Sequence, residues 1–490
     1  MKRRDTLKFI PLSVAGLAFN STLADAQPRP PMMGHPRRDR HPNDGALSTR
    51  YLKKVRNILT WIRNNQSDNL LESSYAIANA LLKGNTCWYS WDCGHSVNSD
   101  IFPGRPAVPS LFTVGFDPKK ARKGDVMLAS IWNGVNAFIE GMGFGDGGEK
   151  PKILEPADVK AKGVMIIGAP APWGMDAKGD EEVVYDSAKF RIRPSSSIWI
   201  ETNATKLGAA LELPGAGAPI GPVSGIVGMI TAWMMTADAC RILAREGKSL
   251  PVEGGGPKLS GDSVPWVSLD SPLMDDYFDT VMRQIGMIEA EMGDIRRIAG
   301  MAVDSVLSGG KVWCYSRDRN ALAYESQTRR GGLALTRGLY DEDGQLSVFG
   351  KPFEGTSKDL VIMGIHEPDN TTDLKHLDTF RRHGCKVASI GPMTRDIKIP
   401  EGRTVPKETD VHLGRMCDTL GLFAVPGFER AICPTSGALL NQLFWTTCLE
   451  ITDEIIRRTG NIPCVYLTGA VKGGIDHLNR VDRIYEERGY

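Results

Sequence analysis

The stretch that decides the fold is PVSG at residues 222–225, because a close copy, PTSG, stands at residues 434–437. Each copy opens an apolar run of helical length, residues 226–243 after the first and 438–456 after the second. One tryptophan in each run stands at the same distance from its Ser-Gly pair. A repeat of roughly 200 residues is much longer than one unit of a solenoid. We therefore expect two related, domain-sized lobes around a shared cleft.

Equivalent elements precede the two apolar runs. Aligning Gly84 with Gly309, which is 225 residues later, also superposes Trp88 on Trp313. Short apolar strands are predicted in pairs, at residues 86–90 and 311–316, 125–130 and 359–364, and 164–168 and 386–391. Continuous apolar strands that alternate with helices are typical of a parallel sheet covered on both faces. The sequence therefore predicts an α/β protein with two parallel-sheet lobes in tandem, each of three layers, α/β/α.

Helical patterns open both lobes. The first lobe shows two apolar stripes at helical spacing, within residues 55–62 and 70–82. The second lobe shows one such stripe, within residues 285–306. Each pattern stops at a glycine, as helix C-termini commonly do.

Composition limits the kind of protein. The 490 residues predict about two to four domains, and 41% hydrophobic with 24% charged residues is typical of a globular protein in water. The net charge of +1 gives no electrostatic reason to expect a nucleic acid or an acidic membrane surface as partner. We expect neither.

Residues 1–26 are predicted to be a targeting segment. A basic start with Arg3 and Arg4 is followed by an apolar stretch, residues 9–19, and by the small-x-small pattern Ala-Asp-Ala at residues 24–26. The pattern resembles a bacterial twin-arginine signal, and an ordinary secretory signal is the alternative. Either predicts a bacterial protein in the periplasm or otherwise outside the cytoplasm. The apolar stretch is too short for stable membrane insertion after cleavage.

The rest of the chain divides by composition. Proline, glycine, serine and aspartate gather in two stretches without apolar periodicity. The predicted segments are the signal (1–26), a flexible tether (27–48), the first lobe (49–246), a linker (247–272) and the second lobe (273–490).

The cysteines do not predict a disulfide framework or a metal site. There are nine, an odd number, and Cys87 and Cys314 lie inside apolar strands. We expect buried free thiols. Cys87, Cys93 and His95 match no zinc-binding spacing, so no metal and no cofactor are predicted.

Polar side chains follow the predicted strands or open the late helices. In open parallel sheets, ligands bind beyond the carboxyl ends of the strands. Small hydroxyl and amide residues there can cap a helix, or they can hold a phosphate or a sugar hydroxyl. Both roles stay open for the predicted substrate-binding residues, which are Ser96, Ser130, Asn133, Ser224, Ser316, Asn370, Thr371, Thr372 and Ser436.

The order of these elements resembles the sugar isomerase (SIS) domain. CGHS at residues 93–96 is similar to the Gly-His-Ser loop after the first strand in one branch of that family. Residues 321–333 are similar to the next family segment, which carries a glutamate and ends in Arg-x-Gly-Gly. The resemblance covers roughly residues 51–245 and 276–479. It implies flavodoxin-like five-stranded sheets that bind phosphosugars or related sugars, and homodimers are common among such proteins.

The resemblance also implies a chemistry. Family enzymes interconvert aldose and ketose by a proton shift, which needs a base over the C–H bond and donors for the enediolate oxygens. Glu325 is then the candidate base, with an exposed helical glutamate as the alternative. His95 or His366 is the candidate for ring opening. Ser96 and the Thr371-Thr372 loop would hold the anionic or hydroxylated end of the sugar.

Departures from the family pattern leave the activity open. The family's Ser-x-Ser-Gly-x-Thr loop is replaced at residues 130–136 and 364–371, and the second lobe has RDRN at 317–320 where the first keeps Gly-His-Ser. Each lobe retains a different half of the pattern. The chain is then an isomerase with one composite site or a non-catalytic carbohydrate-binding or sensing protein. A lyase or epimerase that starts with the same proton abstraction is a third possibility.

Overall fold

The computed structural model describes residues 46–89, 100–101, 107–129, 135–136, 153–169, 192–204, 208–253, 266–317, 322–326, 329–342, 345–348, 351–395, 398–417, 421–467 and 473–490. The predicted signal segment and nearly all of the predicted tether lie outside these residues.

The first sheet has five parallel strands. They are β1 (Cys87–Tyr89), β3 (Thr113–Val114), β4 (Val126–Ala129), β7 (Met165–Gly168) and β8 (Ile198–Trp199). They lie in the order β3-β1-β4-β7-β8. Numbered along the chain, this is the order 2-1-3-4-5 of flavodoxin-like folds.

The second sheet repeats this order. Its parallel strands are β12 (Val312–Ser316), β13 (Thr336–Glu342), β16 (Leu360–Gly364), β17 (Lys386–Ile390) and β18 (Val411–Leu413). They lie in the order β13-β12-β16-β17-β18, again 2-1-3-4-5, and two antiparallel strands, β14 (Gln345–Val348) and β15 (Lys351–Pro352), extend the β13 edge. The prediction of two parallel-sheet lobes is confirmed. All three predicted strand pairs are present, as β1 and β12, β4 and β16, and β7 and β17.

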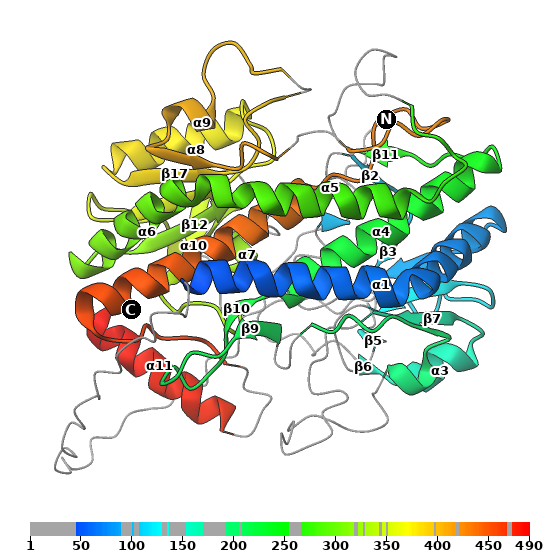
Figure 1. Cartoon of the computed structure of the whole chain (residues 1–490), viewed down its shortest axis with the longest axis horizontal. Helices are drawn as coiled ribbons and strands as arrows, with labels where there is room; N and C mark the ends of the chain where they lie inside the picture. Colours follow the sequence, from blue (N-terminus) through cyan, green and yellow to red (C-terminus); the bar gives the residue numbers. More distant parts are fainter. Residues whose placement is uncertain are drawn as a thin grey trace.

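Each sheet is covered on both faces, as three layers require. In the second sheet, side chains alternate between a core under α8 (Thr371–Arg382) and the main core under α6 (Met292–Leu307) and α10 (Ser436–Thr459). In the first sheet, they alternate between α3 (Pro156–Ala161) and the side of α1 (Leu47–Leu82) and α4 (Ser224–Arg245). Figure 1 shows the strands of the first sheet in cyan and those of the second in yellow-green, at opposite ends of the long helices.

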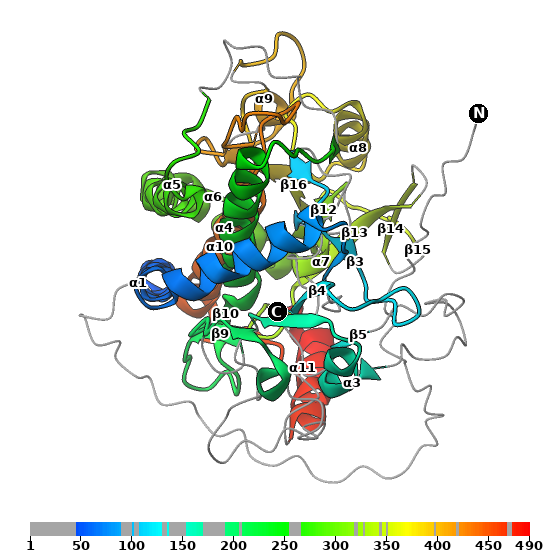
Figure 2. The ribbon, with the colours of Figure 1, turned by 90° about the vertical axis from the view of Figure 1, so that its right-hand side faces the viewer.

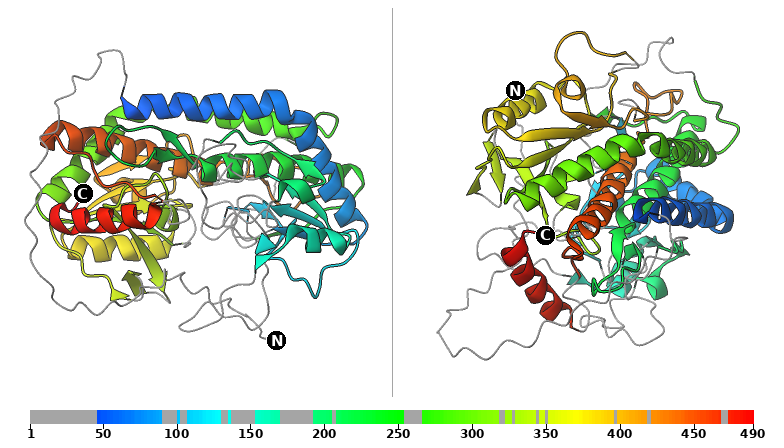
Figure 3. Two further views of the ribbon diagram at one scale, coloured as in Figure 1. Left: turned by 90° about the horizontal axis from the view of Figure 1, so that it is seen from below. Right: turned by 60° about the vertical axis from the view of Figure 1, so that its left-hand side comes forward.

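The long first helix of each lobe spans both lobes. Helix α1 is continuous for 36 residues, so the two predicted stripes belong to one helix. Its start contacts α10, where the Leu47 N–H donates to Asp453 over 2.9 Å. Its later part contacts α4, where the Ser74 hydroxyl donates to the Met235 carbonyl over 3.1 Å. Packing at both ends keeps the polar middle of the helix folded. Figure 3 shows α1, in blue, reaching over both halves of the molecule.

The counterpart in the second lobe is interrupted. It consists of α5 (Leu273–Met287), the 3-10 turn η4 (Ile288–Glu291) and α6, where the sequence predicted one apolar stripe across the turn. Glu291 ends the turn, and its carboxylate accepts hydrogen bonds from the N–H groups of Gly414 and Arg415 over 2.7 and 2.9 Å. The turn therefore carries a carboxylate to the loop after β18.

Helices α4 and α10 form the centre of the molecule. Both begin at the serine of the duplicated Pro-x-Ser-Gly motif, as predicted. Met229 and Asn441, which are 212 residues apart like the motifs themselves, contact each other with 3.8 Å between Sδ and Nδ2. Equivalent positions therefore meet, as they do on a local two-fold axis. Figure 2 shows α1 and α5 on one side of α4 and α10 and the strands on the other.

One described helix, α4, is long and apolar enough to cross a bilayer, and its most apolar window is wholly buried inside the protein. That is how the core helix of a globular domain packs.

A pair of structural carboxylates shows how closely the lobes match. The Trp88 indole N–H donates to Asp125 over 2.9 Å, and the Trp313 indole N–H donates to Asp359 over 3.0 Å. The other oxygen of each carboxylate accepts from the backbone N–H two residues before the tryptophan. These aspartates therefore tie the first strand of each sheet to the strand beside it.

Smaller elements complete the described chain. They are β2 (Val108–Pro109), β5 (Val135–Asn136), β6 (Ile153–Leu154), η2 (Arg193–Ser195), β9 (Ala209–Leu211), β10 (Ile220–Pro222), β11 (Val252–Glu253), α7 (Leu322–Glu325), α9 (Val405–Glu408) and α11 (Gly474–Arg488). Within the predicted linker, β11 pairs with β2 of the first lobe, and Trp266 bridges Ala424 of the second. Linker residues 254–265 lie outside the described residues.

The cysteines are as predicted wherever the structure describes them. All eight are buried free thiols. The ninth, Cys93, lies outside the described residues.

Candidate functional site

The carboxyl edge of the second sheet is the most completely described part of the predicted site. His95, Ser96, Ser130 and Asn133 belong to first-lobe loops outside the described residues. Ser316, His366, Asn370, Thr371 and Thr372 all follow strands of the second sheet.

Ser316 ends β12 and holds the helix that carries Glu325. Its side chain is buried, and its hydroxyl accepts a hydrogen bond from the Ala323 N–H, at the start of α7, over 3.4 Å. The end of β16 lies equally close to α7, because a Cβ added at Gly364 would lie 2.8 Å from the Cβ of Leu322. The loop after β12 therefore turns back at once over the sheet edge.

The loop between β16 and α8 brings the next group together. Asn370 caps α8, and its side-chain oxygen accepts from the N–H groups of Thr372 and Asp373 over 3.0 and 3.2 Å. The capping role is confirmed for this residue. Thr371 is exposed, and His366 and Thr372 are half-buried. The side chains at this helix start are thus within reach of a ligand.

Two arginines and a glutamate that the sequence did not single out lie beside this loop. The Glu367 carboxylate is 3.7 Å from Arg317 Nη2 and 3.6 Å from Arg395 Nη2. Asn370 Nδ2 donates to the same carboxylate over 3.2 Å. Arg395 also contacts Asp369 at 3.2 Å. The only available signal was their position, directly after strands of one sheet.

Glu325 is buried between the lobes. It is 1% exposed, so the alternative of an exposed helical glutamate is wrong. Arg329 donates to both of its oxygens, from Nε over 2.8 Å and from Nη2. The pKa of the Tyr51 hydroxyl, on α1, is far above its ordinary value because of burial, the charge of Glu325 and that of Cys448. Glu325 therefore faces the long helix of the first lobe.

Two matching junctions join the lobes near this acid. In junction A, the Gly221 N–H donates to the Gly331 carbonyl over 3.0 Å. In junction B, the Cys433 N–H donates to the Ala107 carbonyl over 3.2 Å. All four residues have positive φ, between 62° and 78°. The residue before each late helix thus meets the segment after the first loop of the other lobe.

The same symmetry identifies an acid that sequence reasoning missed. Asp100 lies 225 residues before Glu325, the offset that aligns Gly84 with Gly309. It is 5% exposed and accepts a hydrogen bond from the Trp233 indole N–H. The offset was visible in the sequence, but the acid was overlooked because the surrounding loops do not match.

Ser224 and Ser436 are the first residues of α4 and α10, next to junctions A and B. Both are buried. The Tyr51 hydroxyl donates to the Pro222 carbonyl just before the first, and the Tyr277 hydroxyl donates to the Pro434 carbonyl over 3.3 Å before the second. These serines therefore lie in the lobe interface, away from the residues around Asn370.

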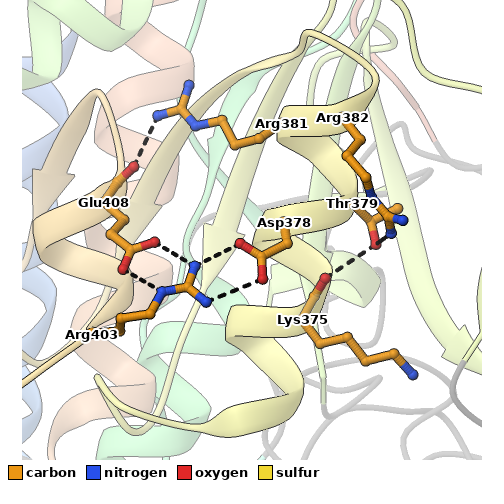
Figure 4. A network of polar contacts seen from close by, with 7 residues as sticks. All are labelled: Lys375, Asp378, Thr379, Arg381, Arg382, Arg403 and Glu408. Carbon is orange, nitrogen blue, oxygen red and sulfur yellow. Dashed lines mark hydrogen bonds and ion pairs between the residues drawn. The ribbon is translucent and has the colours of Figure 1, made fainter.

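The outer face of α8 has a polar groove of about 540 Å³, lined by Thr371, Leu374, Lys375, Asp378, Arg382 and Arg403. Figure 4 shows Arg403 held between Asp378 and Glu408, with 2.7 Å from its Nη2 to a Glu408 oxygen. The guanidinium lowers the pKa of both carboxyl groups. This cluster closes its own charges and fastens α9 to α8.

In the described part of the chain, no three His, Cys, Asp or Glu side chains gather as metal ligands do.

Comparison with known proteins gives distant likenesses. No protein-family model matches the chain. A UPF0309 protein of Streptomyces griseus is 22% identical over 249 residues, which cover 97% of that protein and 45% of this chain. Nearly the whole of that relative thus aligns with less than half of this chain.

Solved structures were also found. The C-terminal domain of glucosamine-fructose-6-phosphate aminotransferase from Francisella tularensis is 10% identical, with a TM-score of 0.41 over 85% of this chain and 96% of that one. A proposed phosphosugar isomerase from Clostridium difficile is 10% identical, with a TM-score of 0.43 over 86% and 96%. Another, from Silicibacter pomeroyi, is 9% identical, with 0.42 over 85% and 99%. Because these scores are below 0.5, the fold assignment rests on the strand order of the two sheets.

Proposed function

We propose that this chain binds a sugar or sugar derivative between its two lobes and interconverts its aldose and ketose forms. The observation that carries the proposal is the pair of junctions, each with a buried acid beside the segment that meets the other lobe. The order of motifs that resembles the SIS domain supports a sugar as ligand. Flavodoxin-like sheets place ligands at their carboxyl edges, which supports a site reached from the loops after β12 and β16.

The proposed reaction is a proton shift between neighbouring carbons. A carboxylate takes the proton from the carbon beside the carbonyl, the C–H electron pair forms the enediolate, and the proton returns to the former carbonyl carbon. Glu325 is the candidate base. Since Arg329 holds both of its oxygens, one must be released before Glu325 can take a proton. His366 or His95 would open the sugar ring, and Ser316 would position α7.

The same ion pair favours a second candidate function, a non-catalytic carbohydrate-binding or sensing protein. A buried carboxylate that is paired through both oxygens fixes a structure more readily than it moves a proton. In that case the chain binds the sugar and leaves it unchanged.

Deuterium exchange separates these functions. Aldoses and ketoses, with and without phosphate, are incubated with the protein in D₂O and analysed by NMR. We expect deuterium at the carbon beside the carbonyl, together with the isomer, and loss of both in Glu325→Gln while sugar binding persists. Binding without exchange would establish the non-catalytic function. Exchange without an isomer would indicate a lyase or epimerase.

Asp100→Asn is the matched variant, because Asp100 holds the equivalent position in the first lobe. Exchange lost in Asp100→Asn and kept in Glu325→Gln would move the base to the first lobe. Absence of both binding and exchange from the unchanged protein would refute the proposal.

We also propose that residues 1–26 direct export to the periplasm by the twin-arginine route. The paired arginines support it. Replacing Arg3 and Arg4 with lysine should leave the protein in the cytoplasmic fraction, since that route needs the arginine pair. Unchanged export would favour an ordinary secretory signal.

A further inference from the structure

The Glu367 carboxylate lies among three hydrogen-bond donors that come from separate parts of the second sheet's edge. Arg317 and Arg395 approach its two oxygens, and the Asn370 amide donates to one of them. The orientation of that amide is fixed, because its oxygen caps α8 through two backbone N–H groups. Asn370 Nδ2 must therefore point towards the carboxylate. The three donors form what we call the anion cradle.

The anion cradle lies where this fold places ligands. Arg317 directly follows β12, Glu367 follows β16, and Arg395 follows β17. Strands β12 and β16 are neighbours at the position where the strand order 2-1-3-4-5 reverses, and ligands of open α/β sheets bind in the crevice outside that position. The start of α8, a 12-residue helix, adds positive potential to the same place.

Glu367 is held loosely. Its contacts with Arg317 and Arg395, 3.7 and 3.6 Å, are longer than hydrogen bonds, whereas Arg403 contacts Glu408 at 2.7 Å in the cluster of Figure 4. The two arginine side chains of the cradle are 32% and 41% exposed, so water reaches them. Ion pairs of this kind contribute little stability. Another anion can therefore take the place of the glutamate.

We propose that the anion cradle of Arg317, Arg395 and Asn370 is a binding subsite for an anionic group. The Glu367 carboxylate fills it in the ligand-free protein, and a phosphate or carboxylate of the ligand displaces it. This inference rests on the proposed function and narrows its sugar derivative to an anionic one. Glu367 then acts as an internal competitor that sets how strongly an anionic ligand must bind.

Binding of inorganic phosphate to the full-length protein tests this directly by calorimetry. Glu367→Gln keeps the size of the side chain and removes the competing charge, so phosphate affinity should rise about tenfold. The gain should shrink at high salt. Adding Arg395→Gln to this variant should abolish it. Glu408→Gln is the matched control, since it removes a carboxylate from an arginine cluster outside the sheet edge, and its phosphate affinity should not change.

Two outcomes would overturn the anion cradle. One is an unchanged affinity in both Glu367→Gln and Glu367→Ala, the second variant guarding against an effect of the glutamine amide. The other is a gain that survives Arg395→Gln. A sugar phosphate and a sugar acid, titrated in parallel, identify which anion is preferred.

The result can be told apart from failure of the proposed function. Phosphate binding that responds to Glu367→Gln without binding of any sugar would support the cradle and refute the sugar function. Sugar binding that is indifferent to Glu367 and Arg395 would do the reverse.

Discussion

The two lobes share a scaffold and differ in the residues around their acids. Both sheets have the same strand order, both first strands are tied by an aspartate to a tryptophan, and both junctions use the same backbone hydrogen bond. Yet Glu325 is paired with an arginine, whereas Asp100 accepts from a tryptophan. Backbone contacts and structural carboxylates therefore preserve the architecture while the side chains at the site diverge.

The largest expected effect concerns the partners of the two acids. Arg329→Met removes the guanidinium from a buried carboxylate, and loss of one partner of a buried ion pair costs about 4 kcal/mol. Trp233→Phe removes the neutral donor of Asp100 and some packing volume, and we expect a loss of about 2 kcal/mol. Urea unfolding of both variants measures the difference. Equal losses would mean that the two acids have equivalent surroundings, contrary to the contacts described.

The next effect should be equal in the two lobes. Asp125→Ala and Asp359→Ala each leave a buried indole N–H and two partly buried backbone N–H groups without their carboxylate. We expect about 3 kcal/mol of destabilisation for each. Hydrogen exchange of the first strands should rise in the altered lobe. If one variant loses much less stability than the other, the structural equivalence of the two aspartates fails.

The scaffold could be predicted because its signals are local. The six strands predicted in pairs are short apolar runs, and each belongs to a described sheet. Strands β8 and β18 were not predicted, because they have two and three residues and no apolar run of their own. The continuity of α1 was hidden as well, since the polar residues 63–69 interrupt its apolar pattern and packing on both lobes keeps it helical.

The site was less predictable because its contacts join distant parts of the chain. Glu325 could be named, but its burial against Tyr51 depends on the pairing of the lobes. Glu367 and Arg395 meet only because β16 and β17 are neighbours in the sheet. Asp100 was within reach of the repeat offset, yet its environment was not. Sequence patterns thus locate strands and helix starts better than the pairing of charged side chains.

Acid should weaken the second sheet selectively. Burial, followed by the charge of Arg415, lowers the pKa of His412 on β18 to about 4, from 6.5 in the unfolded chain. Between these values the unfolded chain binds a proton that the folded protein excludes, so stability falls as the pH falls. The loss should be about 2 kcal/mol at pH 5 relative to pH 7.5.

The control for this pH dependence is His412→Asn, which should remove it. Urea unfolding at both pH values, with hydrogen exchange of β17 and β18, provides the measurement. In the first sheet the corresponding strand, β8, consists of Ile198 and Trp199, which do not titrate. An unchanged pH dependence in His412→Asn would assign the effect to other groups.

The smallest effect distinguishes the two junctions at a single backbone position. Gly221 and Cys433 both have positive φ, 76° and 62°, but only Gly221 lacks a side chain. A Cβ at Gly221 would lie 2.9 Å from Tyr51 Cδ2, so Gly221→Ala adds left-handed strain and displaces the tyrosine ring, at about 1.5 kcal/mol. Cys433→Gly relieves the same strain and loses the buried thiol, so its stability should change by less than about 1 kcal/mol. Thermal unfolding compares the two variants. A larger loss in Cys433→Gly than in Gly221→Ala would mean that the Cys433 side chain, rather than the shared backbone conformation, holds junction B together.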